Sequence, residues 1–218
     1  MRRFIAILTV LFACLFGLPA TASAAPAPIG GGSILFNPVG SGNQCVVAFA
    51  ASGGDREYLI AGPGCDTTMS TQLYSGDNVP VGPVVGGLNH GYVVVAVTNT
   101  DAWDVVGWIN APGGKYSIAG SVETPVGGRV CLLSHTAGIT CGTVTAKNVT
   151  ISYPEGTISG LTQTNICPQP RSIAYVTGDQ AQGVPLGGGS GICTTAGNSY
   201  FFPVNRILSA YGLALLTG

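Results

Sequence analysis

The sequence predicts an all-β fold of short antiparallel strands with one short α-helix near the C-terminus. Short runs rich in Val, Ile, Thr and Tyr recur along the chain, and Gly, Pro, Asn or Asp separates them. Between Ile34 and Tyr116 no segment longer than a few residues has helical periodicity. Closely spaced turn residues of this kind are typical of a β-barrel or a β-sandwich.

The first 24 residues have the three-part layout of a secretory signal peptide. Two arginines precede an apolar run over residues 4–18, and small residues at 22–24 form a cleavage site. The apolar run is too short for a spanning helix, and Cys14 inside it is expected to leave with the signal rather than carry a lipid. We therefore expect a secreted chain, extracellular or associated with the cell wall, without a membrane partner after cleavage.

The first half of the mature chain, residues 33–115, follows an N-terminal segment at 25–32. Ser52-Gly53-Gly54-Asp55 predicts a hairpin turn, and closing the open end of that hairpin would bring Cys45 near Cys65. The predicted strands of this half are Cys45–Ala50, Glu57–Ala61, Gln72–Tyr74, Tyr92–Thr98 and Val105–Ile109.

The second half, residues 116–218, contains a similar series of strands and the helix. Cys131 and Cys141 lie on either side of turn residues 135–137, so a disulfide there would join the two strands of one hairpin. The helix is expected after Pro203 and before Gly212, because four apolar residues in this interval follow the spacing of one helical face. The predicted strands are Tyr116–Val122, Gly128–Leu133, Gly138–Thr145, Val149–Tyr153, Gly156–Gln163, Ile173–Thr177, Gly183–Leu186 and Asn198–Pro203.

Composition excludes several classes of function. Only 8% of the residues are charged, and loss of two signal-peptide arginines changes the formal net charge from −1 to −3. No basic cluster is present, so we expect no nucleic-acid partner. The cysteines lack the paired short gaps of a zinc site, and His90 and His135 are the only imidazoles, so we expect no metal and no other cofactor. The sequence does not predict an oligomeric state.

Three stretches of the second half resemble one known family. Residues 141–150 read Cys-Gly-Thr-Val-Thr-Ala-Lys-Asn-Val-Thr, residues 163–167 read Gln-Thr-Asn-Ile-Cys, and residues 209–212 read Ser-Ala-Tyr-Gly. These stretches are similar to those of bacterial chymotrypsin-like serine proteases, the alpha-lytic protease and streptogrisin branch. The resemblance runs from about residue 29 to the C-terminus and is strongest after residue 128.

The resemblance implies the architecture and the disulfides. It implies two six-stranded antiparallel β-barrels of the chymotrypsin-like protease fold, at 33–115 and 116–218, with the short helix closing the second. Of the seven cysteines, six remain after loss of Cys14 with the signal peptide. An even number in a secreted chain is typical of disulfides, but their spacing alone leaves every pairing open. The resemblance implies pairing in chain order: Cys45 with Cys65, Cys131 with Cys141 and Cys167 with Cys193.

The family's catalytic triad is not intact in this sequence. The family serine lies in Gly-Asp-Ser-Gly-Gly-Pro-Leu, whereas residues 170–176 read Pro-Arg-Ser-Ile-Ala-Tyr-Val, which makes Ser172 the best-placed nucleophile. Gly64 stands in place of the base histidine, and His90 stands in place of the aspartate. A serine alcohol needs a positioned base, and the oxyanion turn needs glycines that are missing here. His90 could serve as base only in a rearranged site, and His135 is a weaker candidate still.

A glycine-rich stretch near the C-terminus resembles the edge along which the family's substrates lie. Residues 187–191 read Gly-Gly-Gly-Ser-Gly, and the corresponding stretch of the family reads Ser-Gly-Gly-Ser-Gly. A groove retained here could bind an extended peptide by backbone pairing. The alternative interpretation of the same residues is a flexible glycine-rich loop closed by Cys193. The predicted groove residues are Leu186, Gly187, Gly188, Gly189 and Ser190.

These observations favour a secreted homologue of the serine proteases that is catalytically inactive and binds an extended peptide or a protein. Two alternatives stay open. One is an active serine endopeptidase whose site is assembled differently, and the other is a structural protein of the cell wall or surface, which low charge and high glycine content would suit. Fold alone does not decide among them.

Overall fold

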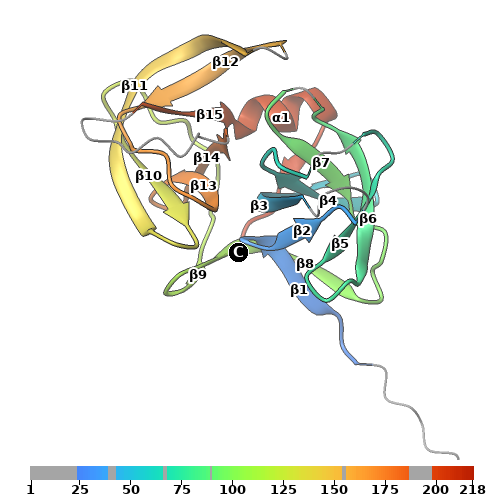
Figure 1. The fold of residues 1–218 in the computed structure, drawn as a ribbon. Helices are drawn as coiled ribbons and strands as arrows, with labels where there is room; N and C mark the ends of the chain where they lie inside the picture. Colours follow the sequence, from blue (N-terminus) through green and yellow to red (C-terminus); the bar gives the residue numbers. More distant parts are fainter. Residues whose placement is uncertain (1–23, 39–42, 66–67, 89, 154–155, 187–197) are drawn as a thin grey trace, which may run out of the picture.

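The computed structural model describes residues 24–38, 43–65, 68–88, 90–153, 156–186 and 198–218. Its strands form two closed rings that lie side by side and a small third sheet (Figure 1). All but the last residue of the predicted signal peptide lie outside the described residues. Within the described part of the chain, no helix is long and apolar enough to cross a membrane.

The first ring has six strands, in the order β3-β2-β5-β6-β7-β4, and the pairing of β3 with β4 closes it. Its interior is apolar: Leu35, Val47, Leu59 and Val95 are fully buried. A short strand, β16 (Ala214–Leu215), pairs antiparallel with Ala51 and Ser52 near the end of β3. The ring strands are β2 (Ile34–Phe36), β3 (Gln44–Gly53), β4 (Arg56–Ala61), β5 (Gln72–Ser75), β6 (Pro80–Gly86) and β7 (Val93–Ala96).

The second ring is a closed barrel in the order β10-β11-β12-β15-β14-β13. Val130, Leu132, Val144, Tyr175 and Phe201 pack together as a buried cluster inside it. Its strands are β10 (Arg129–Ser134), β11 (Gly138–Tyr153), β12 (Gly156–Thr164), β13 (Ser172–Thr177), β14 (Gln180–Pro185) and β15 (Ser199–Pro203). The predicted all-β fold of two six-stranded antiparallel rings with one short helix is confirmed; the boundary between residues 115 and 116 stays a prediction.

The third sheet joins the N-terminal segment to the first ring. Strand β1 (Ala27–Gly31) pairs in parallel with β8 (Trp103–Ala111), which pairs with β9 (Gly114–Tyr116). The sequence did not predict β1, because its glycines disfavour a strand. A glycine at residue 31 is required by packing, since a Cβ there would lie 2.7 Å from the carbonyl oxygen of Ala48.

The predicted C-terminal helix is present as α1 (Val204–Tyr211), and it connects the two rings. Val204, Ile207 and Leu208 are its buried residues, and Gly212 ends it in the left-handed conformation. The hydroxyl of Tyr211 accepts a hydrogen bond from the backbone N–H of Gly87 in the first half, at 2.7 Å. The chain therefore returns to the first ring, where β16 pairs with β3.

Two predicted strand boundaries are wrong. The strand expected over residues 116–122 is absent, because β9 ends at Tyr116 and the next residues make only an isolated bridge at Gly120. The strands expected over 138–145 and 149–153 form one strand, β11, whose pairing with β12 shifts register on both sides of Ala146 and near Asn148, a residue with a φ of 56°. The residues at this irregularity were therefore mistaken for a turn between two strands.

The disulfides Cys45–Cys65 and Cys131–Cys141 are present, as predicted. Cys167 is also disulfide-bonded. Its predicted partner, Cys193, lies outside the described residues.

Candidate functional site

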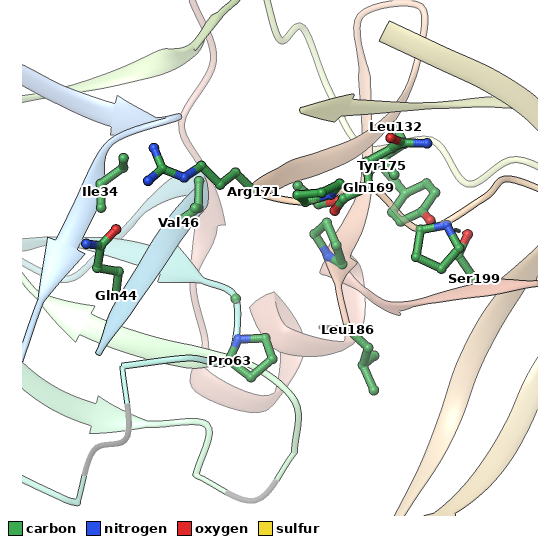
Figure 2. A pocket seen from close by; sticks show the side chains of 15 residues that line it. Ile34, Gln44, Val46, Pro63, Leu132, Gln169, Arg171, Tyr175, Leu186 and Ser199 are labelled. Atoms are coloured by element: carbon green, nitrogen blue, oxygen red, sulfur yellow. Dashed lines mark hydrogen bonds between the residues drawn. The ribbon is translucent and has the colours of Figure 1, made fainter. Parts of the chain in front are cut away.

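A cavity of about 310 Å³ lies between the two rings (Figure 2). Strands β2 and β3 and the segment after β4 form one wall, and the segment before β13 forms the other. Leu186 of the predicted groove lines this cavity, while residues 187–190 lie outside the described part of the chain. The lining residues are Ile34, Gln44, Val46, Gly62, Pro63, Leu132, Pro168, Gln169, Pro170, Arg171, Ser172, Tyr175, Pro185, Leu186 and Ser199.

The end of β10 holds the segment that leads into β13. The Pro170 carbonyl accepts hydrogen bonds from Ser134 Oγ at 2.7 Å and from Thr136 Oγ1 at 2.9 Å. The Arg171 carbonyl accepts one from the backbone N–H of His135 at 3.1 Å. These bonds fix a tight turn in which Arg171 has a φ of 50°, a conformation that L-residues seldom adopt.

Ser172, the predicted nucleophile position, is the first residue of β13 and is half-buried at the cavity. Its hydroxyl donates a hydrogen bond to the Gln169 carbonyl oxygen at 2.7 Å. A backbone carbonyl accepts a hydrogen bond but cannot take the proton away, so this contact does not activate the oxygen. The serine is held in the turn as a structural donor.

The position predicted for the base histidine has no room for a side chain. Gly62 and Pro63 line the cavity, but Gly64 does not. Gly64 has a φ of 137°, and a Cβ there would lie 2.6 Å from the carbonyl oxygen of Gln44. Any larger residue would have to displace the backbone of β3, so glycine is required by the local geometry.

The structure does not bring either histidine to the cavity. His90 is exposed, and its Nδ1 lies 2.7 Å from the Leu88 carbonyl oxygen. His135 is half-buried in the turn after β10, with Nε2 2.8 Å from the Gly32 carbonyl oxygen. Among the described residues that line the cavity, none has an imidazole or a carboxylate side chain.

Arg171 is the residue that sequence reasoning missed. Its side chain reaches from the second ring across the cavity toward Ile34 and Val46 of the first ring (Figure 2). Among the described residues the one ion pair joins Lys147 to Glu123, so Arg171 has no carboxylate partner there. The sequence signal was present, since an arginine stands immediately before Ser172, but only the folded turn shows where it points.

A neutral hydrogen-bonded cluster lies at the second-ring side of the cavity. The Tyr175 hydroxyl bonds to Ser199 Oγ, which also lies 2.8 Å from Thr164 Oγ1. Burial raises the pKa of Tyr175 above its usual value, and the hydrogen bonds from Ser199 and Thr164 oppose that shift. The tyrosine therefore stays protonated near neutral pH, and Arg171 is the charged group among the described lining residues.

Comparisons with known proteins point to one family. No protein-family model matches the chain. Streptogrisin-C of Streptomyces griseus is 37% identical over 192 residues, which are 86% of this chain and 41% of that protein. Serine protease 2 of Streptomyces fradiae is 32% identical over 179 residues, which are 78% of this chain and 100% of that protein.

Solved structures agree with this result. Protease A of Thermobifida fusca superposes with a TM-score of 0.74 at 31% identity, covering 88% of this chain and all of that one. The chain spans about two fifths of the length of Streptogrisin-C but the full length of the shorter relatives. The chain therefore belongs to the streptogrisin and alpha-lytic protease-like family of chymotrypsin-fold serine proteases.

Proposed function

We propose that this chain is a secreted member of the family that binds extended peptides in the cavity between its rings without hydrolysing them. The hydrogen bond from Ser172 to the Gln169 carbonyl carries the proposal. It engages the best-placed nucleophile with a group that cannot accept a proton, and no described lining residue offers a base. Peptide bond cleavage by an alcohol depends on that proton transfer.

Several features support binding. The cavity has about the volume of a small ligand site, and both of its walls contain apolar and neutral polar side chains. Its position between the two rings, together with Leu186 at its edge, suits a peptide that runs in an extended conformation. No described lining residue offers a base, but peptide pairing needs only free backbone groups and space, so binding need not disappear with catalysis.

An active endopeptidase is the second candidate, because the relatives are named as proteases and this chain belongs to their family. Such an enzyme would need a base from outside the described lining residues. A test must therefore follow binding and cleavage in the same reaction, since a binding protein retains intact peptide whereas an enzyme releases fragments.

The experiment incubates the mature chain, from residue 25, with a mixed library of short unstructured peptides. Size exclusion separates bound peptides, and mass spectrometry identifies both retained peptides and fragments. We expect retained intact peptides and no enzyme-dependent fragments, under conditions in which an active streptogrisin cleaves the same library. Time-dependent fragments in proportion to the concentration of this protein would overturn the proposal.

Two variants assign the binding to the cavity. Gly62→Tyr places a large side chain at the cavity wall, at a position where a Cβ meets no atom closer than 3.7 Å. Gly76→Tyr is the matched control, because residue 76 is exposed outside the cavity and a Cβ there meets no atom closer than 3.6 Å. Binding should be lost in the first variant and kept in the second. Equal binding by both variants would show that the peptide does not bind in this cavity.

A further inference from the structure

We infer that Arg171 makes the cavity a carboxylate site, so that its ligand is an extended peptide that places a carboxylate group between the two rings. This inference rests on the proposed peptide binding and adds the chemistry that selects the peptide. It starts from a guanidinium that has no ion-pair partner among the described residues: Arg171 lines the cavity, and the ion pair in that part of the chain lies elsewhere, between Lys147 and Glu123.

The turn fixes the backbone position from which the exposed Arg171 side chain extends. Ser134, Thr136 and the His135 backbone bind the carbonyl groups of residues 170 and 171, so the backbone of Arg171 is held from the β10 side. The unusual φ of 50° aims the side chain away from β13 and across the cavity (Figure 2). Because this backbone is already held, ligand binding needs to order only the side chain, which lowers the conformational entropy lost on binding.

The surroundings favour an anion over a neutral group. Ile34, Val46 and Pro63 form the facing wall, and these apolar side chains offer the exposed Arg171 side chain no hydrogen-bond partner of their own. Among the described lining residues there is no carboxylate to compete for the guanidinium. The side-chain amide of Gln44, on the same wall, adds a neutral hydrogen-bond donor to the lining of the cavity (Figure 2).

A carboxylate fits this donor set, because a planar guanidinium can donate two parallel hydrogen bonds to its two oxygens. In a peptide that group is either the C-terminal carboxylate or the side chain of Asp or Glu. Both have the same chemistry at Arg171, and they differ only in where along the peptide the charge lies. A matched set of peptides separates them.

The test measures fluorescence anisotropy with four forms of one peptide that the intact chain retains. The forms combine a free or an amidated C-terminus with Glu or Gln at one internal position. We expect at least one carboxylate form to bind about tenfold or more tightly than the fully neutral form, the usual range for a charge-assisted hydrogen bond. Which form gains affinity identifies the source of the carboxylate.

Arg171→Gln should remove most of this preference. Arg56→Gln is the matched control, because Arg56 is exposed on β4 outside the cavity and its loss changes the net charge equally. The control should keep the preference, and circular dichroism should show both variants folded. The comparison of peptides on the unchanged chain does not depend on any variant.

The outcomes separate this inference from the proposed function. Equal binding of all four peptides by the unchanged chain, or a preference that survives Arg171→Gln, would overturn the carboxylate site and leave peptide binding intact. A chain that retains no peptide of any charge overturns the proposed function, and the carboxylate site with it.

Discussion

Replacing Gly64 by alanine should destabilise the protein by about 3 kcal/mol. The φ of 137° is open to glycine and disfavoured for every L-residue, which costs about 1–3 kcal/mol. The new Cβ would also lie 2.6 Å from the carbonyl oxygen of Gln44, and moving that backbone adds about 1 kcal/mol or more. The measurement matters because residue 64 is where the family's base would stand.

Gly62→Ala is the matched control two residues earlier. Gly62 is not among the glycines with positive φ, and its nearest contact would be at 3.7 Å, so alanine should be neutral or should stabilise by about 0.5 kcal/mol. Urea unfolding, followed by the fluorescence of Trp103 and Trp108 with the disulfides intact, gives both values. With a slope of about 2 kcal/mol per molar urea, the Gly64→Ala midpoint should fall by about 1.5 M. Equal midpoints for the two variants would refute the claim that residue 64 cannot hold a side chain.

Two further substitutions test the cavity walls. Ser134→Ala removes a buried hydroxyl that bonds to the Pro170 carbonyl, so we expect a loss of about 1–2 kcal/mol in urea unfolding and weaker binding of carboxylate peptides. An unchanged unfolding midpoint would show that the turn does not depend on this bond. Tyr175→Phe tests the raised pKa: folded Tyr175 ionises above its usual value of 10.0, so its contribution to stability is present below pH 10 and is lost as pH rises further. The stability of the phenylalanine variant should therefore fall less steeply above pH 10, and parallel curves of unfolding free energy against pH would contradict the assigned burial effect.

The sequence predicted those parts of the fold that depend on local pattern. The helix at 204–211 follows from apolar spacing between Pro203 and Gly212, and the Cys131–Cys141 disulfide follows from a hairpin around residues 135–137. Strands such as β6 (Pro80–Gly86) were missed, because two prolines and two glycines hide a strand whose pairing is set by its neighbours. Parallel pairing of β1 with β8 is likewise a long-range effect.

The sequence predicted which catalytic residues are replaced, but it did not predict which side chains line the cavity. Gly64 predicted a missing base, and the motif around Ser172 predicted a missing oxyanion turn. Among the described residues that line the cavity there is no histidine. Arg171 could not be selected from the sequence, since its direction depends on contacts from Ser134 and His135, about 36 residues earlier along the chain. Which side chain enters a cavity between two rings is decided by tertiary contacts, and no local pattern encodes it.

Intact-mass spectrometry of the mature chain after exposure to a fluorophosphonate tests the central claim most directly. This reagent forms a covalent adduct with a serine only when a base activates its hydroxyl. The account predicts an unchanged mass, because the Ser172 hydroxyl only donates a hydrogen bond to the Gln169 carbonyl and no described lining residue can remove its proton. A stoichiometric adduct on Ser172 that forms on the folded chain and not in urea would contradict the account.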